Sequence, residues 1–169
     1  MRLKPDSQPS EAALPMLTEF QVVKFVLAYL QGQEQPWSYG SSCNEKQKGD
    51  DLRVESKCGR HASIEAKGET TSKDTSRKGK EFSASQVRCH VAVAVYKAMI
   101  TDPFYLKAIA VPDNKLHRRY VGKILDQLEL LKIEVFWVKR NGEVRVSDHW
   151  NWPVEDLFGN CKTISELNP

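Results

Sequence analysis

The stretch 51–67 constrains the fold of this chain most, because apolar and polar residues alternate along both of its halves. Alternation is typical of a strand with one buried face, so the halves Leu52–Glu55 and His61–Lys67 predict two neighbouring strands. The residues Lys57, Cys58 and Gly59 between them suit a three-residue hairpin loop with the glycine in the left-handed conformation. In this hairpin the expected facing pairs are Ser56 with Arg60, Leu52 with Ile64, and Asp51 with Glu65.

One face of this hairpin is apolar and the other is polar. The apolar face holds Leu52, Val54, Ala62, Ile64 and Ala66. The polar face holds Asp51, Arg53, Glu55, His61, Ser63, Glu65 and Lys67. We expect the apolar face to pack against a helix, which accounts for the alternation without any function. The candidates for a chemical function are therefore the residues of the polar face.

The rest of the chain predicts helices and strands around this hairpin. Helical patterns and caps predict three helices, at Leu17–Gln31, Ser85–Ile100 and Lys115–Leu131. Further strands are expected at Trp37–Tyr39, Leu106–Val111, Ile133–Val138 and Val144–Ser147, and loops at Ser41–Gly49 and Gly68–Ser83. The residues expected to face the core are Phe20, Val23, Leu27 and Leu30 in the first helix, and Tyr120, Ile124, Leu128 and Leu131 in the third. The order predicts an α/β fold with a mixed central β-sheet flanked by helices.

A chain of 169 residues, 40% of them hydrophobic, is long enough for one domain with a real core. We expect a flexible tail at residues 1–15, a single domain at 16–158 and a second tail at 159–169. The N-terminus is polar, and no apolar run approaches the ~20 residues that span a bilayer. These features predict a soluble cytoplasmic protein with reduced thiols and no membrane partner. The net charge of +3 is too small to argue for nucleic-acid binding by itself.

Two carboxylates that face each other across the hairpin, Asp51 and Glu65, repel each other unless a cation neutralises them. Mg²⁺ prefers such oxygen ligands, together with waters and substrate phosphate. Lys67 lies on the same face, where it could orient a water or stabilise charge on a phosphate. These parts predict Mg²⁺- or Mn²⁺-dependent hydrolysis of phosphodiester bonds. Two alternatives stay open. One is a solvated strand face on which charged side chains pair across the two strands. The other is a shift of the hairpin register by one residue, which puts Asp50 in the place of Asp51.

The pattern of Asp51 followed by Glu65, Ala66 and Lys67 resembles the core motif of the PD-(D/E)XK, or restriction-endonuclease-like, nuclease superfamily. The predicted elements are also similar to that family's αβββαβ core, here with an added helix and a C-terminal hairpin. The resemblance covers roughly residues 17–111, and extends to 146 at its widest. It departs at Gly49 and Asp50, where the family often has a proline and the residue after it. It implies that Asp51, Glu65 and the Ala66 carbonyl bind metal, and that Lys67 is catalytic.

Two helices hold further candidates. Gln86 and His90 are four residues apart on one helix face, and some branches of the superfamily carry a similar pair that points into the active site. An ordinary helix N-terminus with a polar pair explains these two residues equally well. Several members of the family also supply an acidic residue from the first helix, where this chain has Glu19. For Glu19 we favour the simpler interpretation, an acid that stabilises the first turn.

A basic segment follows the motif and indicates a partner. The residues expected to contact DNA phosphates are Lys73, Arg77, Lys78, Lys80 and Arg88. A flexible solvated loop is the alternative, but the segment begins beside the proposed active site. The function expected is a DNA nuclease, and the alternative is a nucleic-acid-binding module that keeps the fold and does not cleave. A domain of this size often needs a second copy to place two cuts, so a homodimer stays open.

Overall fold

A six-stranded mixed sheet, in the order β1-β2-β3-β4-β5-β6, organises the computed structural model, which describes residues 14–33, 37–42, 51–57, 59–71 and 78–147. The strands are β1 (Ser38–Ser42), β2 (Leu52–Glu55), β3 (His61–Ala66), β4 (Leu106–Pro112), β5 (Ile133–Val138) and β6 (Val144–Val146). The helices are α1 (Glu19–Gln31), α2 (Ala84–Ile100), α3 (Lys115–Val121) and α4 (Leu125–Leu130). The predicted α/β class with a mixed sheet and packed helices is confirmed.

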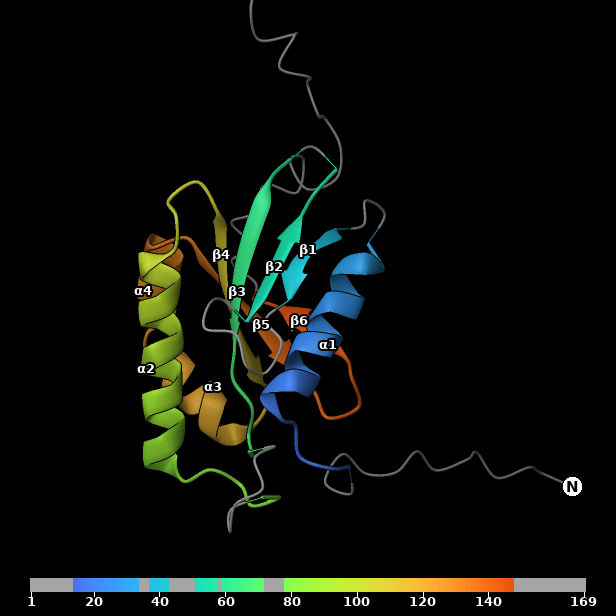
Figure 1. Ribbon diagram of the computed structural model, residues 1–169. Helices are drawn as coiled ribbons and strands as arrows, with labels where there is room; N and C mark the ends of the chain where they lie inside the picture. Colours follow the sequence, from blue (N-terminus) through green and yellow to red (C-terminus); the bar gives the residue numbers. More distant parts are fainter. Residues whose placement is uncertain (1–13, 34–36, 43–50, 58, 72–77, 148–169) are drawn as a thin grey trace, which may run out of the picture.

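The strands at the centre of the sheet are parallel, and those at its edges are antiparallel. β1, β2 and β3 form an antiparallel meander, whereas β3, β4 and β5 run parallel, with α2 and then α3–α4 as their connections. β6 returns antiparallel beside β5. The carboxyl ends of β3, β4 and β5 therefore meet at one edge of the sheet, at the lower end in Figure 1. Polar side chains that follow these strands are brought together at that edge.

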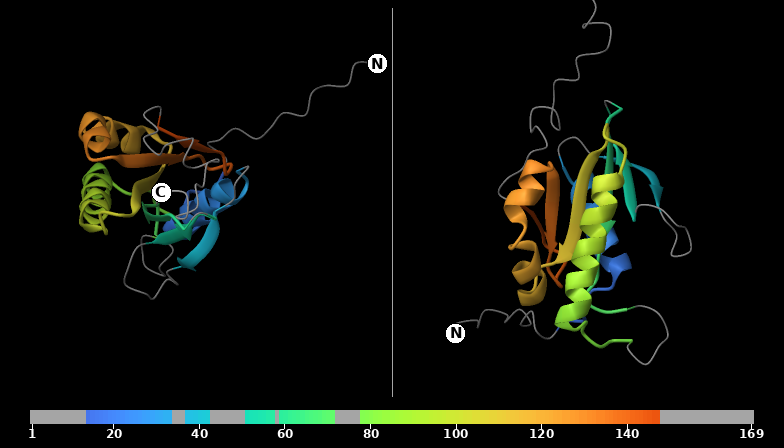
Figure 2. Two further views of the ribbon diagram at one scale, coloured as in Figure 1. Left: turned by 90° about the horizontal axis from the view of Figure 1, so that it is seen from above. Right: turned by 90° about the vertical axis from the view of Figure 1, so that its left-hand side faces the viewer.

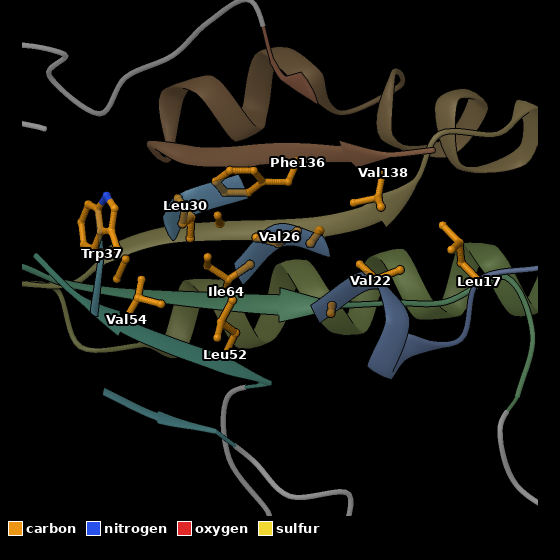
Figure 3. Close-up of a cluster of buried hydrophobic side chains, with 14 residues drawn as sticks. Leu17, Val22, Val26, Leu30, Trp37, Leu52, Val54, Ile64, Phe136 and Val138 are labelled. Atoms are coloured by element: carbon orange, nitrogen blue, oxygen red, sulfur yellow. The ribbon is translucent and has the colours of Figure 1, made fainter. Parts of the chain in front are cut away.

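The helices cover both faces of the sheet. α1 lies on one face, and α2, α3 and α4 lie on the other (Figures 1 and 2). On the α1 face, the apolar side of the β2–β3 hairpin is buried with Val22, Val26, Leu30 and Phe136 (Figure 3). A second cluster joins α2, α3 and α4 to β4 and β5 through residues such as Val91, Ile109 and Val135. The polar face of the hairpin therefore lies on the side of the sheet that α2 covers.

The β2–β3 hairpin has the predicted loop and register. Gly59 has φ 74°, and the Ser56 amide donates to the Arg60 carbonyl at 2.8 Å. The ladder pairs Leu52 with Ile64, as expected from counting outward from the loop. All five residues of the predicted apolar face are buried in the α1 cluster. The alternation and the turn chemistry agree, and together they fix which residues face the helix.

The first helix is rotated relative to its predicted orientation. Thr18 caps α1, in a capping box with Gln21. The fully buried positions are Val22, Val26 and Leu30, and Phe20 is 55% exposed, so the predicted core stripe through Phe20 is wrong there. α1 is anchored just before its start, where the amide of buried Leu17 donates to Glu69 Oε1 at 2.8 Å.

Two predicted elements differ more strongly from the observed ones. The single helix Lys115–Leu131 is wrong: α3 ends at Val121 and α4 begins at Leu125. Gly122 caps α3 between them, consistent with the low helix propensity of glycine. The first strand is Ser38–Ser42 and not Trp37–Tyr39, because β1 continues to pair with β2 as far as Ser42 opposite Leu52.

The predicted tails fall almost wholly outside the described residues, as does most of the predicted loop 41–49. Within the described part of the chain, no helix combines the length and the apolar character that a bilayer crossing requires.

Candidate active site

Four charged side chains converge where β3 ends. The ammonium Nζ of Lys67 lies 3.3 Å from Asp51 Oδ2, 3.4 Å from Glu19 Oε2 and 3.8 Å from Glu65 Oε2. It also donates to the Ala66 carbonyl at 2.5 Å. We call Glu19, Asp51, Glu65 and Lys67 the Lys67 cluster. The structure thus brings together Asp51, Glu65 and Lys67, as predicted, and adds Glu19 from α1.

Glu19 reaches the cluster because the chain before α1 crosses the end of β3 at very close range. A Cβ at Gly68 would lie 2.6 Å from the Glu19 amide nitrogen and 2.8 Å from the Leu17 carbonyl, which leaves no room for a side chain. The Glu69 amide donates to that same carbonyl at 2.8 Å. Glu19 is therefore both an acid in the first turn of α1 and a neighbour of Lys67, so the two interpretations of this residue do not exclude each other.

Asp51 ties the start of β2 to the end of β3. Its Oδ2 accepts a hydrogen bond from the Ala66 amide at 2.8 Å, and the same oxygen is the one nearest Lys67. This contact continues the register that ends at the Leu52–Ile64 pair. Asp50, the alternative in the sequence, lies outside the described residues.

Glu65 is the most confined member of the cluster, with 1% of its side chain exposed. Lys97, on α2, donates to its Oε2 at 2.7 Å. Its other oxygen, Oε1, is buried with no hydrogen-bond partner among the described residues. Burial, assisted by the nearby charge of Asp51, raises the pKa of Glu65 from 4.5 to about 7, against the opposing effect of Lys97 and Lys67.

The oxygens of the cluster are the kind that hold a hard divalent cation. Carboxylates from Asp51, Glu65 and Glu19 and the Ala66 carbonyl surround one positive charge, the Lys67 ammonium. In the described part of the chain, no group of three acidic, His or Cys side chains is arranged around a common metal position. These oxygen ligands nevertheless suit Mg²⁺, because they already surround one cation, the Lys67 ammonium. Glu65 Oε1, which has no hydrogen-bond partner among the described residues, is a further oxygen ligand.

The two predicted residues on α2, Gln86 and His90, have different surroundings. Gln86 belongs to the cap of α2, where its Oε1 accepts from the Ser83 amide and hydroxyl, both at 3.0 Å. His90 packs edge-on against Phe82, with ring centroids 4.6 Å apart. Burial and the positive charge of Lys67 lower the pKa of His90. Of the two, His90 is the one whose charge state is linked to the Lys67 cluster.

Part of the predicted DNA-contact segment is described. Lys78, Lys80 and Arg88 are exposed, whereas Lys73 and Arg77 lie outside the described residues. The segment is held at its base beside the end of β3. The Phe82 amide donates to the Glu69 carbonyl, and the Thr70 hydroxyl donates to the Lys80 carbonyl, each at 2.9 Å.

Sequence reasoning missed a buried polar network next to this site. Glu69 accepts from Arg140 at 2.7 and 2.9 Å, from the Leu17 amide at 2.8 Å and from Asn114 at 3.1 Å. Burial alone would raise the pKa of Glu69, but these donors outweigh it and lower the pKa. We call Leu17, Glu69, Asn114 and Arg140 the Glu69 network. It joins β3, α1, the cap of α3 and the β5–β6 turn.

Lys97 was also missed. Its sequence signal is weak, a single lysine in an otherwise apolar helical segment, with no motif around it. Burial acts to lower the pKa of Lys97, but the hydrogen bond to Glu65 and the surrounding carboxylates outweigh it and raise the pKa.

No family model, curated protein or solved structure matches this chain. The functional argument therefore depends on the residues of the site and their geometry.

Proposed function

We propose that this chain is a metal-dependent nuclease that hydrolyses DNA phosphodiester bonds with Mg²⁺ or Mn²⁺, as in the PD-(D/E)XK superfamily that its motif resembles. The observation that carries the proposal is the convergence of Asp51, Glu65 and the Ala66 carbonyl on the Lys67 ammonium. Buried carboxylates with an unused acceptor are costly for a fold, and such groups cluster at functional sites.

Asp51, Glu65 and the Ala66 carbonyl would hold the ion, with Glu19 as a further carboxylate. When bound, the ion supplies Lewis-acid chemistry, which neutralises phosphate charge and makes a water more acidic. The chain's own contribution is to hold these oxygens in place. Asp51 is fixed by the Ala66 amide, and Glu65 by Lys97.

Lys67 is the cationic group beside the reacting phosphate. Hydrolysis forms a bond from a water oxygen to phosphorus and breaks the bond to a sugar oxygen, which leaves with a proton. Negative charge grows on the phosphate oxygens between these events. An ammonium held in a mostly buried position stabilises that charge more than it would in bulk water.

The test is incubation of the full chain with plasmid and with single-stranded DNA, each in Mg²⁺, Mn²⁺ or EDTA. We expect cleavage that requires the metal. Asp51→Asn protein, purified in parallel, controls for contaminating nucleases and should be inactive. Equal cleavage by both proteins would remove the basis of the proposal.

A second function, a nucleic-acid-binding module that does not cleave, is favoured by one observation. The Lys67 ammonium already pairs with Asp51 and Glu19 and binds the Ala66 carbonyl, so a cation of the chain itself lies among these oxygens. This module would bind DNA equally well in Mg²⁺ and in EDTA. DNA binding that is independent of metal, together with no cleavage in either metal, would favour it over the nuclease.

A further inference from the structure

We infer that a cavity beside Glu65 binds one unpaired nucleotide of the substrate strand, so that the preferred substrate is single-stranded or frayed DNA. This inference rests on the proposed function and deepens it. The cavity has a volume of about 430 Å³ and lies between the polar face of β2–β3 and the carboxyl end of α2. Nothing in the motif predicts it.

The cavity shares a wall with the Lys67 cluster. Glu65 lines it, and the same Glu65 oxygen lies 2.7 Å from Lys97 and 3.8 Å from Lys67. Lys97 also lines the cavity. A group bound there would be next to the position where the reacting phosphate is proposed to lie, which is where an adjoining nucleotide of the same strand belongs.

The lining provides a contact for each part of a nucleotide. Arg53 and Lys97 are cations that suit a phosphate, and Arg53 lies over the Tyr105 ring at 5.9 Å from its centroid. Ile100 and Tyr105 line the cavity with apolar and aromatic carbon that a base can contact. Asp102 is an acceptor for the N–H and O–H groups of a base or sugar.

The Tyr105 ring is held in place from a neighbouring strand. The ring of His61, at the start of β3, stacks on it at 5.2 Å between centroids and 25° between planes. This part of the cavity wall is therefore ordered before a ligand enters. Because the ring is already fixed, a ligand that contacts it loses little binding free energy to the ordering of that side chain.

Size excludes a paired base. Pockets for small ligands are typically about 300–1,000 Å³, and this cavity is near the lower end of that range. It can take one nucleotide, whereas a base pair that continues into duplex on both sides cannot enter a concave site between a helix and a sheet. The strand must therefore be unpaired at this position, which costs least in single-stranded or mismatched DNA.

The first test measures binding without metal, by titration of the full chain with deoxyadenosine 5′-monophosphate, deoxyadenosine or inorganic phosphate. We expect the monophosphate to bind at least tenfold more tightly than either part. Arg53→Ala should weaken its binding about tenfold, and Ile100→Trp, which adds bulk at an exposed position of the cavity rim, should block it. Lys24→Ala removes one charge from α1, on the opposite face of the sheet, and should leave binding unchanged.

The second test compares cleavage of a single strand with cleavage of the same sequence as a blunt duplex. We expect at least a tenfold preference for the single strand, reduced in Arg53→Ala and Ile100→Trp. Equal cleavage of both substrates, or monophosphate binding unaffected by both variants, would overturn the inference and leave the nuclease intact. Monophosphate binding that is weakened in Arg53→Ala and blocked in Ile100→Trp, together with no cleavage of any DNA by the wild type, would sustain the nucleotide site and overturn the nuclease.

Discussion

Glu65 and Glu69 lie four residues apart near the end of β3, and both are 1% exposed, but their surroundings are opposite. Glu69 has donors on both oxygens, including a bidentate Arg140. Glu65 has Lys97 on one oxygen, no partner on the other within the described residues, and the charge of Asp51 nearby. Accordingly the pKa of Glu69 is lowered, and that of Glu65 is raised to about 7.

This difference separates a carboxylate that builds the fold from one that is available for chemistry. Burial of a charge is unfavourable unless other groups satisfy it. The Glu69 network satisfies its carboxylate and ties four segments together, whereas the Lys67 cluster leaves Glu65 incompletely satisfied. Arrangements of the second kind need a ligand or a proton to complete them, which is the property expected of an active site.

The strongest test of this difference is the same substitution, glutamate to glutamine, at both positions. Glu65→Gln should abolish cleavage, as should Asp51→Asn, because each removes charge from the proposed metal site with little change in shape. Glu69→Gln is the matched control and should still cleave under conditions where it is folded. The measurement is single-turnover cleavage of DNA in Mg²⁺ beside a circular-dichroism check of folding. Loss of activity in folded Glu69→Gln, or full activity in Glu65→Gln, would contradict the division of roles.

Lys67 should show the next largest effect. Lys67→Ala should cleave about 10²–10³-fold more slowly, comparable to the loss of one preorganised donor to a transition state elsewhere. Lys67→Arg should rescue poorly, since the planar guanidinium is larger and does not readily give up a proton. Single-turnover rates are compared with DNA binding supported by Ca²⁺, which should change little. If binding falls in proportion to the rate in Lys67→Ala, then the lysine only anchors phosphate.

The hairpin half of the Lys67 cluster could be predicted from sequence. Alternation fixes the faces of β2 and β3, and the Gly59 loop fixes the register, so the positions of Asp51 and Glu65 follow from local rules. The resemblance to a nuclease motif used the same local information. Both depend on contacts between residues close together in the chain.

The other half of the cluster depends on packing at long range. Glu19 contacts Lys67 only because α1 starts against Gly68, and the rotation of α1 was predicted incorrectly at Phe20. Lys97 is on a helix whose exposed positions are also apolar, including Tyr96 and Ile100, so helical periodicity does not indicate which side meets β3. Arg140 pairs with Glu69 across 71 positions, which no local pattern indicates.

The same pair of variants should differ in stability, in the opposite sense to activity. Glu69→Gln leaves Arg140 without its carboxylate and should cost about 3 kcal/mol of unfolding free energy. Glu65→Gln should be neutral or stabilising at pH 8, because it removes a buried charge with an unsatisfied oxygen. Urea denaturation of the wild type and both variants in EDTA provides the comparison. A larger loss in Glu65→Gln than in Glu69→Gln would mean that Glu65 is the structural carboxylate.

The dependence of stability on pH should follow the raised pKa of Glu65. The folded protein retains this proton up to about pH 7, while the unfolded chain releases it near 4.5, so the unfolding free energy should fall as pH rises between these values. The loss should be on the order of 1–3 kcal/mol, and Glu65→Gln should flatten that part of the profile. Added Mg²⁺ should stabilise the wild type above pH 7 and have little effect on Glu65→Gln. A wild-type profile identical to that of Glu65→Gln from pH 4.5 to 8 would show that Glu65 is not the titrating group.

The smallest expected effect concerns the segment that the Glu69 carbonyl and the Thr70 hydroxyl hold beside the Lys67 cluster. Lys78 and Lys80 are exposed and close to its anchored end, where the Lys80 carbonyl accepts from Thr70. If each contacts one phosphate, Lys78→Ala and Lys80→Ala should weaken binding of all DNA sequences a few-fold. Each variant should also lower the slope of log affinity against log salt by about 0.7 for a single strand and about 0.9 for a duplex. Lys132→Ala, an equal charge change between α4 and β5, is the matched control and should leave the slope unchanged. A changed sequence preference with an unchanged slope would mean that the segment contacts bases, in which case Glu69 holds a recognition element and not a phosphate-binding one.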